Sequence, residues 1–408
     1  MKRPRGPLAC VMGDTDLLRP LGLAGIPCAV VTKPGAPARF SRFARVVVPW
    51  RDAWEHADEL VDILTAFAAS QPEAPVLFYQ EDRELLLVSR YRDVLRPRFR
   101  FVVADATLVE DLVDKSRFQA LAARLELPVP RAHPFDPTDR SQPSELGLQF
   151  PLVIKPLTRR TDRWAPVGGA GKALCVATPA ALAELWPRLA AAGEPLMAQE
   201  LVPGPESAME SYHVYVDERG ETAAEFTGRK IRTHPTQHGH STALEITDAG
   251  DVAALGRDLV HRVGLRGVAK LDFKRGPDGR LHLLEINPRF TLWHHPAALA
   301  GVNVPLLVYG DLTGAPRPPL RKARAGVQWC KLWQDWAPAR AAGVPLWRWL
   351  PWALRCQAKR AVSWDDPLPL VGAALWSLGT SLFGRGRRAP AARQAAPAPA
   401  WARARRLR

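Results

Sequence analysis

An alternation of short apolar runs with helical segments, from residue 7 to residue 79, constrains the fold of this chain most. Four of the runs have the length and composition of buried strands, at 7–13, 26–31, 45–48 and 75–79. Leucines recur between them at helical spacing, as at Leu17 and Leu21, and the segment 53–69 is predicted to be a helix. This rhythm is typical of a parallel sheet covered by helices and predicts an α/β fold.

The first predicted strand ends at Gly13, a position where some α/β proteins bind a nucleotide. The further glycines of a dinucleotide fingerprint do not follow, and Asp14 and Asp16 lie in the turn instead. Because two carboxylates would repel a pyrophosphate, we assign no nucleotide to this turn.

Beyond residue 106 the pattern changes to longer helices and to pairs of strands. Helices are predicted at 107–127, 179–192 and 251–263. Strands are predicted at 150–156, 196–202, 267–274 and 280–286, with a hairpin around Asp217–Gly220 and a loop over 159–173. Thr107 and Glu110 have the spacing of a capping box at the start of the first of these helices. The 408 residues exceed what one core needs, so two or three domains are expected.

Most of the net charge of +15 is concentrated at the two ends of the chain. The segment 384–408 holds eight arginines and no acidic residue, and Lys2, Arg3 and Arg5 lie at the front, which leaves the body at +4. A nearly balanced body argues against nucleic acid as a partner, and the Ala/Pro/Arg composition of the tail predicts disorder. The five cysteines form no CxxC pair, and we expect reduced thiols in a cytoplasmic protein.

Three oxygen-bearing side chains lie on the predicted hairpin of residues 267–286. Asp272 lies on the first strand, and Glu285 and Asn287 share one face of the returning strand. With a tight turn between the strands, Asp272 is expected opposite Leu283, which makes Glu285 its diagonal neighbour. Carboxylate and amide oxygens suit Mg²⁺, which proteins bind through one or two carboxylates together with substrate phosphates. A solvated hairpin face with scattered charges is the alternative interpretation.

Three further features are compatible with a bound nucleotide. Lys155 stands alone in an apolar strand, and a buried lysine requires an anionic partner, which is either a structural carboxylate or a phosphate. The glycine-rich segment 168–172 could lay backbone N–H groups on phosphates, although flexible turns use the same residues. The strand end 199–206 could pair with a nucleotide base, and Glu206 with ribose hydroxyls; an interdomain hinge is the alternative.

The order of these motifs resembles that of ATP-grasp enzymes. The shared elements are DK at 114–115, VIKP at 153–156, the glycine loop, QELVPG at 199–204, GRKIR at 228–232, KLDF at 270–273 and LEINPR at 284–289. The resemblance covers about residues 7–315 and is nearest to carboxylate–amine ligases of the D-aspartate-ligase-like type. It implies an N-terminal Rossmann-like pre-ATP-grasp domain over 1–106 and a two-lobed ATP-grasp domain over 107–315, with a small lobe at about 130–200.

The resemblance also implies roles for the matched residues. ATP would contact Lys115, Lys155, Gly168, Gly169, Gly171, Lys172, Glu200, Leu201, Val202 and Glu206. Mg²⁺, or Mn²⁺ in its place, would bind to Asp272, Glu285 and Asn287. The catalytic side chains would be Arg289, Lys230 and Arg232. The implied reaction uses ATP to activate a small-molecule carboxylate as an acyl-phosphate and then couples it to an amine.

Several positions keep more than one interpretation. Leu271 precedes Asp272 where many relatives carry a polar or acidic residue, so the identity of the first metal ligand is open. Five of the ten histidines form two groups near these motifs. His234, His238 and His240 suit a substrate loop better than a zinc site, and His294 and His295 either line the substrate pocket or pack in the fold.

The composition changes again after residue 316. Nine of the 14 Trp lie beyond residue 326, and the uncharged segment 368–383 is shorter than the ~20 residues that cross a membrane. We expect a Trp-rich helical extension over 316–383 that packs on the body, with peripheral contact to an anionic membrane as the alternative. A non-catalytic ATP-binding scaffold, a phosphoryl-transfer enzyme with a non-carboxylate acceptor, and a homodimer also stay open.

Overall fold

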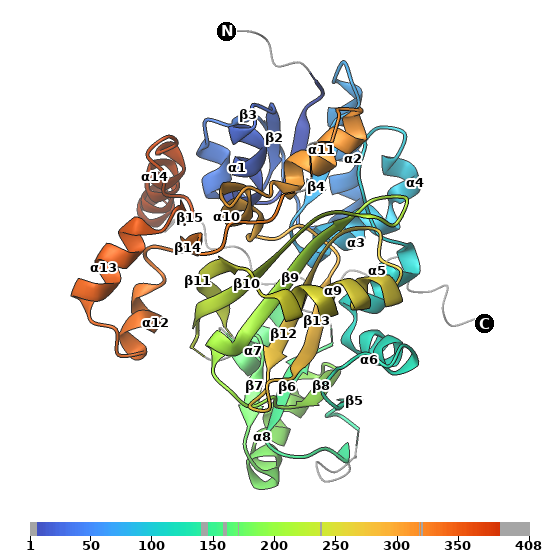
Figure 1. Cartoon of the computed structure of the whole chain (residues 1–408), viewed down its shortest axis with the longest axis vertical. Coiled ribbons are helices and arrows are strands. Elements are labelled where there is room, and N and C mark those ends of the chain that lie inside the picture. Colours follow the sequence, from blue (N-terminus) through green and yellow to red (C-terminus); the bar gives the residue numbers. More distant parts are fainter. Residues whose placement is uncertain are drawn as a thin grey trace.

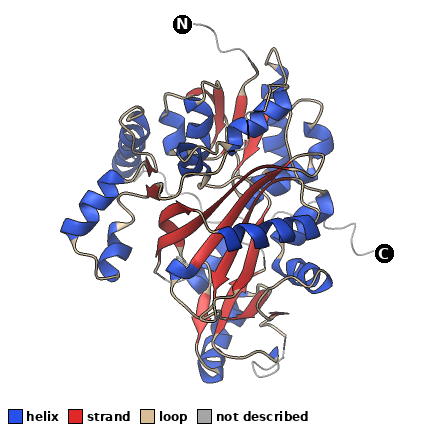
Figure 2. Cartoon of the chain, viewed as in Figure 1, coloured by secondary structure: helices blue, strands red, loops and turns tan. Residues whose placement is uncertain are grey.

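The computed structural model describes residues 6–139, 146–157, 161–169, 171–236, 239–317, 319 and 321–383, which are arranged around three β-sheets (Figure 1). Most helices lie on the outside of the molecule, and the strands lie between them (Figure 2). The tail 384–408, for which we predict disorder, lies outside the described residues.

The first sheet is parallel throughout, with the strand order β3-β2-β1-β4. Its strands are β1 (Ala9–Met12), β2 (Cys28–Val31), β3 (Ala44–Val48) and β4 (Val76–Tyr79), and its helical elements are α1 (Thr15–Leu23), η1 (Pro37–Phe40), α2 (Ala57–Ala69), α3 (Asp82–Arg90) and α4 (Arg92–Leu95). The strands β1, β2 and β4 are buried along their whole length, which explains their continuous apolar sequence. The predicted parallel sheet is confirmed.

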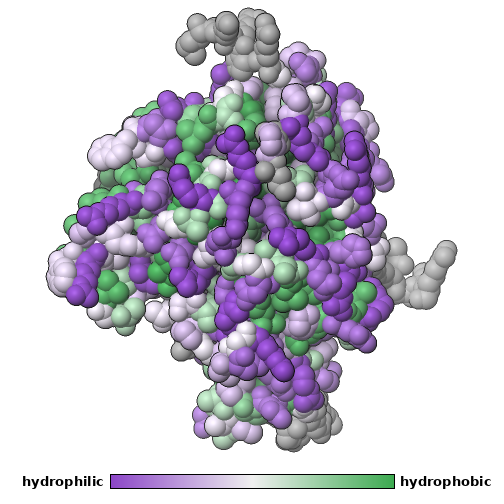
Figure 3. Space-filling view, in the orientation of Figure 1, coloured by the Kyte–Doolittle hydropathy of each residue, from purple (hydrophilic) through white to green (hydrophobic). Residues whose placement is uncertain are grey.

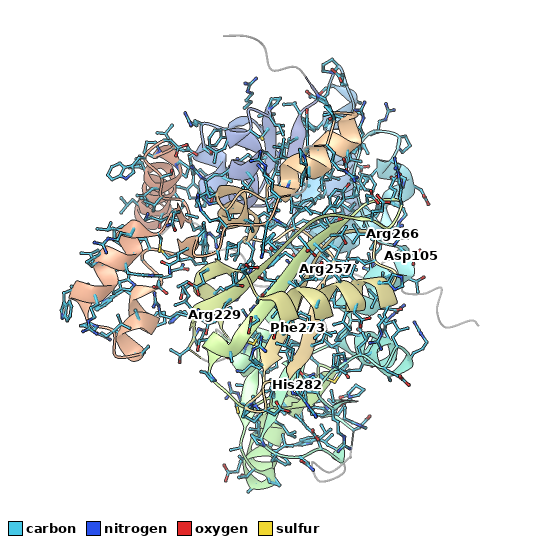
Figure 4. All side chains as sticks on the ribbon, in the orientation of Figure 1. Asp105, Arg229, Arg257, Arg266, Phe273 and His282 are labelled. Atoms are coloured by element: carbon cyan, nitrogen blue, oxygen red, sulfur yellow. The ribbon has the colours of Figure 1, made fainter. Side chains whose placement is uncertain are left out.

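The helix predicted at 107–127 is two helices, α5 (Ala106–Val113) and α6 (Lys115–Arg124). Asp114 separates them because its side chain caps the backbone at the start of α6. Asp105 (Figure 4) caps α5 by accepting a hydrogen bond from the backbone of Thr107. The predicted capping box at Thr107 was therefore wrong, because the preceding aspartate takes that position.

The second sheet has the strand order β5-β8-β6-β7 and forms, with two helices, a small lobe of the molecule. It consists of β5 (Ala132–Phe135), β6 (Leu152–Pro156), β7 (Leu174–Val176) and β8 (Leu196–Glu200), packed with α7 (Thr161–Gly168) and α8 (Pro179–Ala192). The loop predicted over 159–173 was partly wrong, because α7 occupies its centre. Trp164 and Val167, one helical turn apart, are buried in the core of this lobe and explain the helix.

The third sheet has seven strands in the order β13-β12-β9-β10-β11-β14-β15. These are β9 (Met209–Val216), β10 (Thr222–His234), β11 (His240–Thr247), β12 (Gly267–Arg275), β13 (Leu281–Asn287), β14 (Gln328–Cys330) and β15 (Ala358–Lys359). A short 3₁₀ turn, η3 (Glu206–Ala208), precedes β9, and the helix α9 (Gly250–Arg262) lies across the sheet (Figure 1). The predicted hairpins around Asp217–Gly220 and over 267–286 are confirmed.

The C-terminal part follows α10 (His294–Leu299) and α11 (Val304–Thr313) and contributes α12 (Trp336–Ala341), α13 (Leu346–Arg355) and α14 (Leu368–Phe383). It joins the body because β14 pairs with β11 and extends the third sheet. The fully buried Asp335 strengthens the junction by accepting hydrogen bonds from Thr242 of β11 (2.7 Å), from the indole of Trp349 (2.9 Å) and from Arg232 of β10.

The outer side of α13 keeps a row of apolar side chains in solvent. Leu346, Trp347, Leu350 and Leu354 are between 43% and 67% exposed, whereas Trp349 faces the body. Apolar residues are otherwise interspersed among polar ones on the face drawn in Figure 3. Within the described ranges, no helix has the length and apolarity to cross a bilayer. Peripheral contact with an anionic membrane stays a prediction, and so do the domain limits at residues 106 and 315.

Candidate active site

A cavity of about 720 Å³ lies where the three sheets meet, a volume that suits a small-molecule ligand. Its walls come from the carboxyl ends of β1, β2 and β4, from the second and third sheets, and from the residues that follow β14 and β15. It is lined by most of the predicted site residues: Lys115, Lys155, Lys172, Glu200, Leu201, Val202, Glu206, Lys230, Asp272, Glu285, Asn287 and Arg289.

Asp272 and Glu285 face each other directly across β12 and β13. A register shift just after Asp272 brings this about, so the predicted pairing with Leu283 and the diagonal position of Glu285 were wrong. Asn287 lies two residues further along the same face, and its amide donates a hydrogen bond to Glu285 (3.2 Å). The three oxygen-bearing side chains therefore lie together, closer than the sequence predicts.

Neighbouring groups hold these two carboxylates in place. Asp272 accepts hydrogen bonds from the hydroxyl of Ser211 (2.8 Å) and from the amine of Lys270 (2.5 Å). Glu285 opens onto the cavity but is surrounded by protein, and this burial raises its pKa. Lys172, Lys270 and the hydrogen bonds with Asp272 and Asn287 together outweigh this effect and set the pKa of Glu285 well below its usual range. Glu285 is therefore an anion at neutral pH.

The donor set fits magnesium rather than a closed zinc site. Two carboxylates and one amide oxygen are the protein ligands that Mg²⁺ takes when substrate phosphates complete its coordination. The described residues contain no group of three or more His, Cys, Asp or Glu side chains that could hold a metal ion by themselves. His234 and His240 belong to no such group, and His238 of the predicted loop lies outside the described residues.

Lys155 and Lys115 form a cationic wall of the cavity. Lys155 donates a hydrogen bond to the side-chain oxygen of Gln199 (2.8 Å), which is a neutral partner. Burial lowers the pKa of Lys155 to about 8, with a further lowering by Lys115 and an opposing effect of Glu285. Lys115 donates to the carbonyl of Leu157 (3.0 Å). A buried amine next to a neutral amide is stabilised when a phosphate enters the cavity.

The strand end after β8 has fewer open backbone groups than predicted. The N–H groups of Glu200 and Leu201 donate to the carbonyls of Arg131 and Pro151. The contact predicted between a nucleotide base and the backbone of residues 200–202 therefore cannot use the N–H groups of Glu200 and Leu201. Glu206 lines the same end of the cavity, as the prediction of a ribose contact requires.

The glycine-rich segment contributes its lysine and not its glycines to the cavity. Gly168 ends α7, Gly169 has a positive φ of 61°, and the carbonyl of Gly171 accepts a hydrogen bond from Trp164 (2.9 Å). Lys172 reaches the cavity wall, where it acts on Glu285. The predicted nucleotide contacts of Gly168, Gly169 and Gly171 are absent from the lining in the described part of this loop, which lacks residue 170.

Of the three predicted catalytic side chains, Arg289 and Lys230 line the cavity. Arg289 is fixed by Asp82 (2.5 Å), by the carbonyl of Gln80 (2.9 Å) and by Asn287 (3.2 Å). Although burial opposes it, the carboxylate of Asp82 raises the pKa of Arg289 above its usual value. Lys230 is 7% exposed and lies on β10.

Arg232 lies outside the cavity, which corrects its predicted place in the site. Its guanidinium binds Asp335 with two nitrogens (2.6 and 3.0 Å) and lies 4.3 Å from the ring of Trp352. A bulge in β10 between Lys230 and Arg232 interrupts the alternation of faces that would otherwise put both side chains on the same side of the strand. Arg229 (Figure 4) pairs with Glu245 and is also not part of the cavity lining.

The two consecutive histidines after the metal motif pack in the core and do not line the cavity. His294 and His295 are 1% and 3% exposed. His294 contacts the rings of Phe226 and Phe290, and burial lowers its pKa to about 3. His295 accepts a hydrogen bond from Arg19 (3.3 Å). Of the two interpretations left open for this pair, packing is correct.

Sequence reasoning missed the residues that close the cavity from the first sheet and the C-terminal part. They are Asp14, Gln80, Glu81, Asp82, Lys331 and Arg360. The signal for the first four was present, because they directly follow the predicted strands β1 and β4, and polar residues at the carboxyl ends of parallel strands often form sites. Lys331 and Arg360 had no such signal in the sequence.

A parallel N-terminal sheet, followed by a small lobe and a larger sheet that enclose a cavity lined by lysines and carboxylates, is the arrangement of the ATP-grasp fold. The comparisons agree. The family described as "ATP-grasp in the biosynthetic pathway with Ter operon" matches residues 193–332. The L-amino acid ligase of Bacillus licheniformis has the same fold, with a TM-score of 0.56 and 14% identity over 76% of this chain and 75% of that chain.

N5-carboxyaminoimidazole synthetase from Staphylococcus aureus, solved with ADP, also has this fold, with a TM-score of 0.59 and 13% identity over 78% of this chain and 80% of that chain. The D-aspartate ligase of Enterococcus faecium is 23% identical over 286 residues, which is 68% of each protein. The chain thus resembles the ATP-grasp enzymes and, among them, the carboxylate–amine ligases of the D-aspartate-ligase-like type.

Proposed function

We propose that this chain is an ATP-dependent ligase, which activates a carboxylate as an acyl-phosphate, couples it to an amine and releases ADP. One observation carries the proposal: Asp272 and Glu285 face each other on the wall of a cavity that Lys155 also lines. Opposite charges on facing walls suit a triphosphate whose charge is neutralised from both sides.

Each wall of the cavity has a separate task in this proposal. Lys115, Lys155 and Lys172 bind the phosphates of ATP, and Val202 and Glu206 hold its nucleoside. Asp272, Glu285 and Asn287 would hold Mg²⁺, which when bound supplies positive charge to the phosphates. Arg289 and Lys230 bind the carboxylate and hold it in line with the transferring phosphoryl group.

The chemistry requires this arrangement because a carboxylate is a poor electrophile. Transfer of the terminal phosphoryl group of ATP to one carboxylate oxygen turns that oxygen into a leaving group. The amine then attacks the carbonyl carbon, and phosphate leaves with the former carboxylate oxygen. Enclosure between three sheets keeps water from hydrolysing the acyl-phosphate. The names of the relatives, a D-aspartate ligase and an L-amino acid ligase, support an amino acid among the substrates.

The substitution Glu285→Gln tests the proposal, with Glu218→Gln on the exposed turn before β10 as the control. ADP release from the full chain is measured with MgATP and pairs of amino acids and small carboxylic acids, and mass spectrometry identifies the product. We expect Glu285→Gln to keep the melting temperature of the wild type and to lower turnover about a hundredfold or more. Unchanged turnover in this variant would contradict the assignment of the carboxylates.

The same assay separates the alternatives. A phosphorylated acceptor in place of an amide would indicate a phosphoryl-transfer enzyme, and nucleotide binding without ADP release would indicate a non-catalytic scaffold. Homodimer formation stays a prediction that the molar mass in solution will decide.

A further inference from the structure

The cavity has a second end, which the proposed nucleotide and metal contacts do not use. The carboxyl ends of β1, β2 and β4 form one side of it and contribute Asp14, Thr32 and Glu81. The other side comes from the C-terminal part, through Lys331 directly after β14 and Arg360 directly after β15. Arg360 lies beyond residues 193–332, which are the part of the chain that the ATP-grasp family matches.

Lys331 is a cation of this second end without a fixed counterion. Its amine forms no hydrogen bond and no ion pair with any residue in the described ranges. Burial lowers the pKa of Lys331 to about 8; Arg360 lowers it further, and Asp16 and Asp14 oppose this effect. A partly buried charged amine is destabilising without an anion next to it, so binding of an anionic ligand next to Lys331 would be favourable.

Two of the three carboxylates that act on Lys331, those of Asp14 and Asp16, already accept hydrogen bonds from other groups, and Glu81 is the third. Asp14 accepts from the guanidinium of Arg360 (2.5 Å) and from the backbone of Thr15 (2.8 Å). Asp16 accepts from the indole of Trp329 (2.8 Å). The salt bridge to Asp14 uses one nitrogen of the Arg360 guanidinium and fixes the orientation of its other N–H groups.

Two hydrogen bonds connect this end to the proposed reaction centre. The backbone of Asp14 donates to the side chain of Gln80 (2.8 Å), and the carbonyl of Gln80 accepts from Arg289 (2.9 Å). Arg289 is the side chain that we place on the reacting carboxylate. Lys331 and Arg360 therefore belong to a wall that begins next to the acyl-phosphate and leads away from the nucleotide.

We propose that Lys331 and Arg360 form a carboxylate-binding subsite for the amine substrate, which is thus an amine that carries its own carboxylate, as an amino acid does. The proposal rests on the proposed ligase function. The carboxylate lies against the two cations, and the amine of the same molecule points along the wall towards Arg289, where it attacks the acyl-phosphate. The C-terminal part of the chain is then a specificity element as well as a structural extension.

The substitution Lys331→Met tests the subsite because it keeps an unbranched side chain of nearly the same length and removes its charge. Lys331→Arg retains the charge, and Lys322→Met, which removes an exposed lysine paired with Asp248, is the matched control. For each full-length variant, KM values are measured by ADP release with MgATP, the carboxylic acid and each of the twenty L-amino acids or D-aspartate as amine. The analogue of the best amino acid substrate that keeps the amine and lacks the carboxylate is tested in the same assay.

We expect Lys331→Met to raise the KM for the amino acid about tenfold or more while the KM for ATP stays within about twofold. Lys331→Arg should restore most of the affinity, and Lys322→Met should match the wild type. The amine without a carboxylate should be a poor substrate of the wild type, whereas Lys331→Met should not discriminate against it. An unchanged KM for the amino acid in Lys331→Met would overturn the subsite. So would equal use of the carboxylate-free amine by the wild type, or ADP release that depends on no amino acid.

These outcomes are distinguishable from failure of the ligase function. If the wild type releases ADP and forms an amide with an amine that has no carboxylate, the ligase stands and the subsite falls. If the wild type binds no MgATP by calorimetry, the ligase function itself falls. Circular dichroism and melting temperature confirm that each variant is folded before its kinetic constants are compared.

Discussion

Replacement of Arg232 by methionine should destabilise the protein and leave its cavity intact. The sequence pattern places Arg232 among the catalytic residues, whereas the structure places it against the fully buried Asp335. The substitution removes the guanidinium and leaves the carboxylate of Asp335 with Thr242 and Trp349 as its remaining donors.

The expected loss follows from the burial of the pair. The side chain of Arg232 is 14% exposed and that of Asp335 is 0% exposed. Removing one partner of a buried ion pair costs ~3–5 kcal/mol, since the other charge stays buried without compensation. Arg229 lies on the same strand, but its side chain is 51% exposed in its pair with Glu245. Its replacement by methionine should therefore cost no more than ~1 kcal/mol.

Urea unfolding of the two variants and of the wild type, followed by tryptophan fluorescence, measures this difference. Trp349 and Trp352 lie at the affected junction, so their emission reports its loss. Isothermal titration with MgATP under native conditions provides the second measurement, and we expect similar affinities for all three proteins. Equal stability of Arg232→Met and Arg229→Met would refute the reasoning, as would a folded Arg232→Met protein that no longer binds ATP.

Two further predictions follow from other parts of the molecule. Lys155→Ala should weaken ATP binding. The affinity of the wild type for ATP should fall as the pH rises through about 8, because the amine of Lys155 loses its charge there. Since the pKa of Lys155 is lower in the folded protein than in the unfolded chain, the free energy of unfolding should increase over the same rise in pH. An affinity independent of pH between 7 and 10 would remove Lys155 from the phosphate site. If the exposed face of α13 contacts anionic lipid, the full chain should float with phosphatidylglycerol vesicles. Leu350→Glu and deletion of 385–408 should weaken flotation, whereas the control Val94→Glu, on another exposed helix, should not. Catalysis should survive the deletion.

The parts of the fold that depend on local pattern could be predicted from the sequence. The strands β1, β2 and β4 are continuous apolar runs because both faces are buried, and the hairpin of β12 and β13 follows from alternation around a tight turn. Capping was less accessible, because Asp105 and Thr107 are both good caps and only tertiary packing decides between them. The helix α7 was missed because its two core residues, Trp164 and Val167, lie among polar and glycine-rich neighbours.

The residues of the candidate site likewise divide into those that local sequence pattern could predict and those that it could not. Asp272, Glu285 and Asn287 lie near one another in sequence and on one hairpin, so their meeting could be predicted, apart from the bulge that sets the register. Arg232 differs because a bulge in β10 and a partner about a hundred residues away decide its direction. Neither a one-residue bulge nor a long-range ion pair has a signature in a single sequence.

The same reasoning explains why the second end of the cavity could not be found from sequence. Lys331 and Arg360 come together only because β14 adds to the edge of the third sheet and β15 then pairs with β14. Two or three residues in each of these short strands thus decide which cations reach a cavity whose other lining residues all lie at or before position 293. Such a short strand can change without disturbing the sheet it joins, whereas β12, which carries Asp272, is fixed by pairing with β13 on one side and with β9 on the other. Phosphoryl chemistry on the central sheet and selection of the amine by the added edge would then be separable, and the contrast between Glu285→Gln and Lys331→Met measures that separation.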